Sequence, residues 1–155
     1  MGTNRAVAVG SATDALFFTL VAAGINAGDR VAIPSMTFVA TASPVIRAGA
    51  VPVFVDAGDD FQPDIELVES RSVDAVITAH LYGQLFDIGP LANACLANGV
   101  VLIEDAAQAL GATFNGSAPG EQSLAATLSF DPMKVAGAFG SGGAIVTNNP
   151  DVANR

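Results

Sequence analysis

The sequence contains one cysteine, Cys95, and six basic side chains against fifteen acidic ones, which gives a net charge of −9. A single cysteine excludes an internal disulfide and most cysteine-based metal frameworks, and it is typical of a reducing compartment. The scarcity of basic residues argues against nucleic acid and anionic membranes as partners. The longest apolar run near the N-terminus, residues 15–25, is too short to span a bilayer. We therefore expect a cytoplasmic protein with no metal site, no nucleic acid partner and no membrane partner.

Half of the 155 residues are apolar and only 14% are charged, which favours one domain with a buried α/β sheet. Apolar runs alternate with helical patterns, as is typical of a mostly parallel sheet covered by helices on both faces. Cys95 lies in one of these helical patterns, and we expect it in the core. A loop at 57–62 should precede a short helix opened by Pro63. The expected strands cover residues 5–9, 31–34, 51–55, 73–78, 100–103, 125–130 and 144–147. The other expected helices cover residues 15–24, 37–48 and 87–98.

Lys134 is the only lysine in the chain. It follows the turn signal Asp131-Pro132, and four glycines lie between residues 137 and 143. The pattern predicts a lysine on a tight connection between two buried strands. Burial disfavours the ammonium form, so an amine in this position can act as a nucleophile. A lysine whose stem covers apolar surface while its charge reaches water explains the same pattern.

Residues 10–14 join the first expected strand to the first expected helix. Free backbone N–H groups at a helix N-terminus bind anions, and the hydroxyls of Ser11 and Thr13 add further donors. The segment therefore predicts a phosphate site. Helix capping by Thr13 or Asp14 accounts for the same residues. The glycine fingerprint of dinucleotide-binding proteins is missing, because Gly10 is the only glycine of the turn.

Other side chains with reactive or ligand-binding groups lie where expected strands end. Asp105 follows the strand at 100–103, at the edge where open parallel sheets bind ligands; a solvated acid is the alternative. Phe38 lies at a strand–helix junction, where it stacks on a flat ligand or belongs to the core. The only histidine, His80, is either a ligand contact or a structural imidazole. A lysine, an acid, an aromatic ring and a phosphate-binding turn are together the groups needed to hold pyridoxal phosphate.

Five segments carry a resemblance to a known family: GSATDAL (10–16), IPSMTFVATASPVIRAGAVPVFVD (33–56), AHLYGQ (79–84), LIEDAAQALGA (102–112) and LSFDPMKVAGAFGSGGAIVT (128–147). In order and spacing they resemble the sugar aminotransferases of the DegT/DnrJ/EryC1/StrS family, within the fold-type I pyridoxal phosphate enzymes. The resemblance covers nearly the whole chain. It implies a three-layer α/β/α fold, that of the large cofactor-binding domain of these enzymes, in incomplete form.

The resemblance also implies roles for individual residues. Lys134 is the catalytic residue and forms the Schiff base with pyridoxal 5′-phosphate. Asp105 pairs with the ring nitrogen, Gln108 lies against the ring or its hydroxyl, and Phe38 stacks on the ring. Family members that dehydrate their substrates resemble these sequences but have histidine at the lysine position, so Lys134 favours transamination. The resemblance assigns contacts with the phosphate to Ala12, Thr13 and Ser129.

As implied partners, the resemblance gives an amino-acid donor, expected to be glutamate, and a nucleotide-linked keto sugar as acceptor. It also implies a homodimer with the active site at the interface. Ala12 stands where glycine is usual in the family, and Val135 where many members have asparagine. Residues 1–155 are expected to form part of the large domain without the small C-terminal domain, and to be inactive alone. A non-catalytic remnant and another fold-type I activity are the alternatives, although the DPMK context argues against the second.

Overall fold

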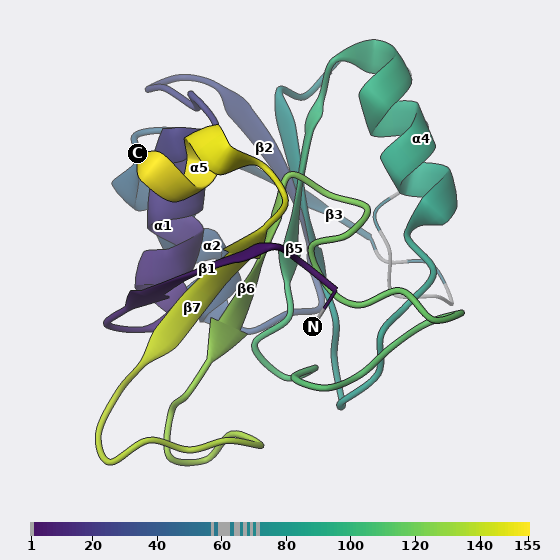
Figure 1. Cartoon of the computed structure of the whole chain (residues 1–155). Helices are drawn as coiled ribbons and strands as arrows, with labels where there is room; N and C mark the ends of the chain where they lie inside the picture. The colour runs from purple at the N-terminus through teal and green to yellow at the C-terminus, as the bar shows by residue number, and fades with distance from the viewer. Residues whose placement is uncertain are drawn as a thin grey trace.

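A seven-stranded sheet forms the middle layer of the protein, and helices cover both of its faces (Figure 1). The computed structural model describes residues 2–56, 58, 63, 66, 68, 70 and 72–155, so most of the predicted 57–62 loop and of the helix after Pro63 lies outside the described residues. The strands are β1 (Arg5–Val9), β2 (Arg30–Pro34), β3 (Val51–Val55), β4 (Ala75–Ala79), β5 (Val101–Asp105), β6 (Ala125–Ser129) and β7 (Gly143–Thr147). The helices are α1 (Ala12–Ala22), α2 (Val39–Arg47), α4 (Gly89–Asn98) and α5 (Pro150–Asn154).

The strand order is β1-β7-β6-β5-β4-β2-β3. Among the described strands, only β7 runs opposite to the others, because it pairs antiparallel with both β1 and β6. The remaining neighbours pair in parallel. The predicted α/β class with a mostly parallel sheet is therefore confirmed. Because β4, β5 and β6 are parallel neighbours, their carboxyl ends meet at one edge of the sheet, where ligands bind in open α/β folds.

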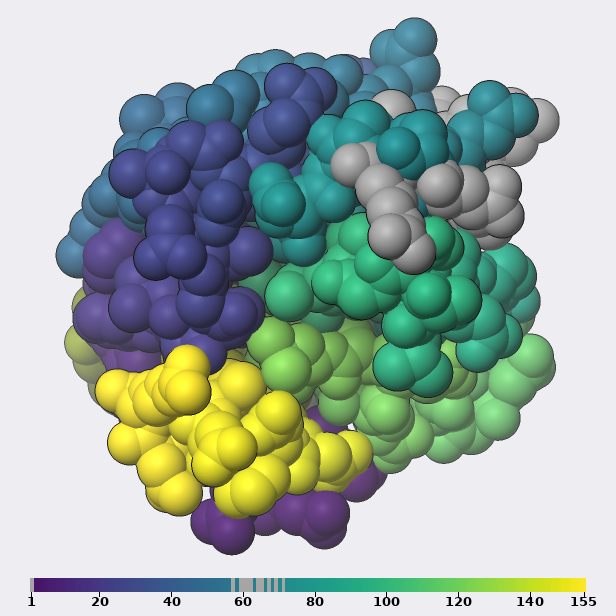
Figure 2. All heavy atoms as spheres, turned by 90° about the horizontal axis from the view of Figure 1, so that it is seen from above, coloured from purple at the N-terminus to yellow at the C-terminus, as the bar shows by residue number. Residues whose placement is uncertain are grey.

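One face of the sheet packs against α1, α2 and α5. Alternate residues of neighbouring strands point to this face, as the two-residue period of a strand requires. The C-terminal helix lies beside the N-terminal strand, and Figure 2 shows the last residues in yellow next to the first ones in purple. The buried apolar side chains of this layer include Leu16, Leu20, Ile33, Val45, Ile77 and Ile103.

The opposite face is covered by α4 and, over β6 and β7, by the segment that follows β5. Cys95 belongs to this layer and is 2% exposed, so its predicted core position is confirmed. Gly99 ends α4 in the left-handed conformation with φ 70°, which glycine adopts without strain. Within the described residues, no helix combines the length and the apolar character that a membrane crossing needs.

The element boundaries differ from the predicted ones at several functional positions. Helix α1 begins at Ala12 rather than at residue 15, because Ser11 caps it one turn earlier than expected. Strand β5 continues through Asp105, so this acid belongs to the strand rather than to the loop after it. Helix α5 was not predicted; Asn149 caps it by accepting hydrogen bonds from the backbone N–H groups of Asp151 and Val152.

Candidate active site

A cavity of about 510 Å³ lies between the first turn of α1, the start of α2 and the connection from β6 to β7. A smaller hollow of about 40 Å³ shares part of its wall and reaches the end of β5. The structure brings all seven predicted site residues to these two spaces. Ala12, Thr13, Phe38 and Lys134 line both of them, Ser129 lines the larger one, and Asp105 and Gln108 line the smaller one.

The first turn of α1 presents backbone N–H groups to the cavity. Ser11 is the N-cap: its side-chain oxygen accepts from Asp14 N at 3.0 Å, and its carbonyl accepts from Ala15 N at 2.9 Å. The N–H groups of Ala12 and Thr13 lie ahead of this first helical hydrogen bond, so they are available to an anion. The predicted cap at Thr13 or Asp14 is therefore wrong, and Thr13 is left with its side chain in the cavity wall.

Asp14 has a different role from the predicted one. Its carboxylate accepts hydrogen bonds from the Arg47 guanidinium at 2.7 Å and from the Ser11 hydroxyl at 3.0 Å, and these two interactions lower its pKa. Arg47 also lies over the Phe17 ring, with its guanidinium carbon 3.9 Å from the ring centre. The Asp14–Arg47 ion pair connects the start of α1 to the last turn of α2. Because Asp14 also bonds the Ser11 hydroxyl, the pair stabilises the cap of the anion-binding turn.

Asp105 is buried, with 8% of its surface exposed. Its Oδ2 accepts a hydrogen bond from the Thr41 hydroxyl at 2.7 Å, and its Oδ1 accepts one from Ala107 N at 3.1 Å. Burial raises the pKa of this carboxyl above its usual range, while these two hydrogen bonds and the nearby charge of Lys134 oppose the rise. The alternative of a solvated acid is wrong, and Thr41 is a site residue that sequence reasoning missed.

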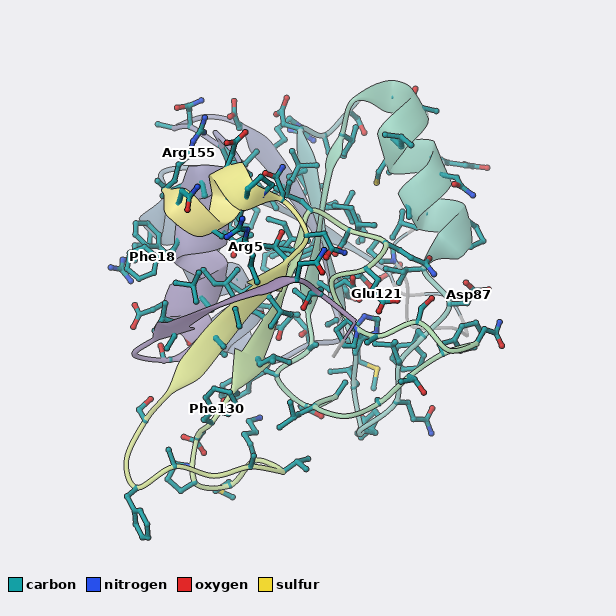
Figure 3. The ribbon with its side chains drawn as sticks, viewed as in Figure 1. Arg5, Phe18, Asp87, Glu121, Phe130 and Arg155 are labelled. Atoms are coloured by element: carbon teal, nitrogen blue, oxygen red, sulfur yellow. The ribbon has the colours of Figure 1, made fainter. Side chains whose placement is uncertain are left out.

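Lys134 lies on the 130–142 connection, which leaves β6 at Phe130 and extends away from the sheet (Figure 3). Its backbone N–H donates to Asp131 O at 2.8 Å, and the carbonyl of Phe130 accepts from Ala138 N at 2.8 Å, so the connection folds back on itself. The side chain is half-buried and lines the cavity. The predicted burial of the two flanking strands is confirmed, because every residue of β6 and β7 is buried. The predicted tightness of the connection is wrong, because the glycine-rich segment projects from the sheet edge and leaves most of its residues exposed.

Phe38 and His80 were each expected either to contact a ligand or to be structural, and the structure separates the two residues. Phe38 is 67% exposed at the cavity wall, so it does not belong to the core. His80 is fully buried: its Nε2 donates to Glu104 Oε2 at 2.8 Å, and its Nδ1 accepts from Phe86 N at 3.2 Å. Because Nδ1 is an acceptor, Nε2 carries the proton of a neutral ring. His80 is therefore a structural imidazole, although it borders the smaller hollow.

Gln108 connects the site to the segment after β4. Its Oε1 accepts a hydrogen bond from the backbone N–H of Tyr82 at 3.0 Å. Tyr82 has a φ of 58°, a conformation that is uncommon for residues other than glycine and that often marks functional sites. The side chain of Gln108 therefore holds a strained turn at the rim of the smaller hollow.

A groove of about 620 Å³ lies between α4 and the segment that leads into β6. It shares no lining residue with the candidate site. Its wall combines apolar side chains with the polar groups of Asn93, Glu121 and Gln122, and it contains neither a lysine nor a buried acid. The chemistry of the residues, rather than the size of the hollow, distinguishes the candidate active site.

Known proteins resemble this chain in sequence and in fold. A pleiotropic regulatory protein of Geobacillus stearothermophilus is 44% identical over 98% of the chain and 42% of its own length. The dTDP-3-amino-3,4,6-trideoxy-alpha-D-glucose transaminase of Streptomyces venezuelae is 39% identical over 99% of the chain and 41% of its own length. The structure of NtdA from Bacillus subtilis with bound cofactor PMP superposes with a TM-score of 0.87, at 34% identity, over 97% of the chain and 35% of that protein.

The chain therefore spans less than half the length of these relatives. The model of the DegT/DnrJ/EryC1/StrS aminotransferase family matches residues 1–155. Since this match covers the whole of the chain, the chain belongs to the DegT/DnrJ/EryC1/StrS aminotransferase family.

Proposed function

We propose that residues 1–155 form part of the cofactor-binding domain of a pyridoxal phosphate-dependent aminotransferase. The enzyme transfers an amino group from an amino acid, glutamate in this proposal, to a keto sugar linked to a nucleotide. The observation that carries the proposal is the convergence of Lys134, Asp105 and the first turn of α1 on adjoining spaces. The name of the Streptomyces venezuelae relative, a transaminase of a dTDP-linked sugar, supports the substrate class.

One end of the cavity fits a phosphate group. The N–H groups of Ala12 and Thr13 lie at the positive end of α1, where an anion is favoured. Thr13 and Ser129 line the same cavity, and hydroxyl groups are suitable donors to phosphate oxygens. In the proposal these three residues hold the phosphate of the cofactor.

The smaller hollow, which shares part of its wall with the cavity, fits a pyridine ring. The exposed face of Phe38 is available for stacking, and the Asp105 carboxylate is the partner that a protonated ring nitrogen needs. Gln108 borders the same hollow and is placed to contact the edge of the ring. Lys134 contributes the primary amine that holds the cofactor covalently. The residues present therefore match each chemical group of pyridoxal phosphate.

When bound, pyridoxal phosphate supplies an aromatic ring that accepts the electron pair released from a breaking C–H bond. The protein residues set the conditions for this chemistry. Asp105 would keep a positive charge on the ring nitrogen, and the turn at Ala12 and Thr13 would hold the phosphate group. The amine of Lys134 would take the proton from the carbon that bears the amino group of the donor, and in the second half of the reaction it would give a proton to the sugar carbon that receives the amino group.

A homodimer is part of the proposal. Large apolar side chains remain exposed on the 130–142 connection and at the start of α2: Met133, Val135 and Phe139 are more than three-quarters exposed, and Phe38 is 67% exposed. Exposed apolar patches of this kind mark protein interfaces. A second copy that covers them would also complete the wall of the cavity. The proposal places the enzyme in the cytoplasm, where the thiol of Cys95 stays reduced.

The test is to trap the cofactor on its lysine. The chain is incubated with pyridoxal phosphate, reduced with borohydride and digested, and the modified peptide is found by mass spectrometry. We expect the adduct on Lys134, which is the only lysine of the sequence. Lys134→Arg keeps the charge but removes the reactive amine, so it should abolish the adduct and the visible absorbance band. An adduct found only at the N-terminal amine would contradict the proposal.

A further inference from the structure

Two threonine hydroxyls lead from the smaller hollow to the buried carboxylate of Asp105. The Thr37 and Thr41 hydroxyl oxygens lie 2.8 Å apart, and the Thr41 hydroxyl donates to Asp105 Oδ2 at 2.7 Å. Thr41 is completely buried, whereas Thr37 is half-buried and lines the same hollow as Asp105. Neither threonine belongs to the set of residues for which the sequence predicts a role.

The direction of this hydrogen-bond chain follows from counting protons. A hydroxyl has one proton and two acceptor lone pairs. Since the proton of Thr41 points to Asp105, Thr41 can only accept from Thr37. The chain is therefore polarised toward the carboxylate, and each hydrogen bond strengthens the next one.

We propose that Thr41 is a positioning residue, which together with Thr37 holds the Asp105 carboxylate in its orientation and its ionised state. The proposal rests on the proposed function, in which Asp105 pairs with the ring nitrogen of pyridoxal phosphate. Thr41 does not touch the cofactor in this scheme. It acts on the cofactor only through the acid.

The contacts on both oxygens support this assignment. Asp105 Oδ2 accepts from Thr41 on α2, and Oδ1 accepts from Ala107 N on the segment after β5, so two separate elements fix the rotation of the carboxyl group. Burial alone favours the neutral acid, which cannot balance a charged ring nitrogen. The other charged or titratable groups that act on Asp105 are His80 and Lys134. Thr41 therefore supplies the closest side-chain donor that stabilises the ionised form.

Helix α2 also connects the acid to the stacking residue. Phe38 is the N-cap of α2, and Thr41 lies in its first turn. The hydrogen bond from Thr41 to Asp105 anchors this turn to the end of β5. The face of Phe38 and the carboxylate of Asp105 are thus held in one arrangement on two sides of the same hollow.

The chain offers a matched control for the loss of a buried hydroxyl. Thr19 on α1 is also completely buried, but its Oγ1 has no hydrogen-bond partner among the residues that the structure describes. Thr19→Val and Thr41→Val make the same chemical change in the same helical layer of the protein. Only the second removes a donor from Asp105.

The first experiment follows the ionisation of Asp105 in the cofactor-free chain by carboxyl ¹³C NMR, with Asp105→Asn to assign the resonance. In Thr41→Val we expect the titration midpoint to rise by about one pH unit, the size that follows from losing one hydrogen bond to a charged group. Thr41→Ser, which keeps the hydroxyl, should restore it, and Thr19→Val should leave it unchanged. An unchanged midpoint in folded Thr41→Val would overturn the assignment.

The second experiment adds pyridoxal phosphate labelled with ¹⁵N in the ring. We expect the ring nitrogen resonance to move toward the unprotonated position in Thr41→Val, and to stay in place in Thr41→Ser and Thr19→Val. A raised midpoint of Asp105 with an unmoved ring resonance would overturn the proposal for the cofactor. If the unaltered chain binds no pyridoxal phosphate, the proposed function fails, whereas the first experiment still decides whether Thr41 controls Asp105.

Discussion

Gly143 at the start of β7 lies directly against the backbone of Ser11, the residue that caps α1. A Cβ atom built on Gly143 would lie 2.6 Å from Ala12 N and 2.6 Å from Ser11 O, and it would overlap Ser11 C. These are backbone atoms, so they cannot move aside as a flexible side chain can. The absence of a side chain at Gly143 therefore allows the anion-binding turn to sit on the sheet.

Gly143→Ala is expected to separate the first turn of α1 from β7. Overpacking of this kind costs about 1–3 kcal/mol of the free energy of unfolding, which urea denaturation measures. The affinity for pyridoxal phosphate should fall as well, because the N–H groups of Ala12 and Thr13 move. Gly142→Ala is the control: its Cβ would lie 3.3 Å from Phe130 Cβ, so the neighbour would need to shift by only a few tenths of an ångström. Equal losses in the two variants would contradict the prediction.

Much of the site could be predicted because it depends on local patterns. The strands at 5–9 and 51–55 have the predicted bounds. Lys134 and Asp105 follow apolar runs, and the carboxyl ends of parallel strands necessarily meet at one edge. The strand periodicity therefore brings together residues that are far apart in the sequence.

Contacts between distant elements could not be predicted. Thr41 and Asp105 are 64 positions apart, and a threonine in the first turn of a helix has no local feature that points to a buried acid. The sequence alone does not distinguish a cap at Thr13 or Asp14 from one at Ser11, because all three residues have good capping side chains. The packing of this turn against Gly143, which no local pattern reveals, favours Ser11 as the N-cap. The exposure of the Lys134 connection was missed because its glycines are equally typical of a tight turn.

Glu104 is expected to be essential for stability although it faces away from the cavity. Its Oε1 accepts from Gly120 N at 2.9 Å and from the Ser123 hydroxyl at 2.6 Å, and its Oε2 accepts from His80. Glu104→Gln places an amide donor against one of these donors, so the free energy of unfolding should fall by about 2–4 kcal/mol in urea denaturation. Glu121→Gln, at a half-buried position nearby, should change it by less than about 0.5 kcal/mol. A Glu104→Gln protein as stable as the unaltered chain would rule out this role.

Cys95 is expected to react slowly with alkylating reagents in the folded chain. Burial raises the pKa of its thiol from 9.0 to about 11, which leaves about 100-fold less thiolate at pH 8. Mass spectrometry after a timed exposure to iodoacetamide should find the native protein mostly unmodified and the urea-unfolded protein fully modified. Similar rates in the two states would place Cys95 outside the core.

The last prediction concerns the pH dependence of stability in the cofactor-free chain. The pKa of Asp105 is raised in the folded state above its ordinary value of 3.8, so between these two values the folded chain binds a proton that the unfolded chain has released. Stability must then fall as the pH rises through this window, and it becomes constant above the folded pKa. Asp14 has the opposite sign: Arg47 and Ser11 lower its pKa, so its contribution is present above pH 3.8 and is lost as the pH falls through the lowered value.

Two variants separate these effects, because asparagine does not titrate. Relative to the unaltered chain, Asp105→Asn should gain stability as the pH is raised from about 4 to 8, since only the unaltered chain must ionise a buried acid. Asp14→Asn should be less stable than the unaltered chain at pH 7, and the difference should shrink as the pH falls below 4. Urea unfolding across this range measures both. If the difference between Asp105→Asn and the unaltered chain does not change with pH, burial does not control the ionisation of Asp105, and the hydrogen bonds from Thr41 and Ala107 compensate for it completely.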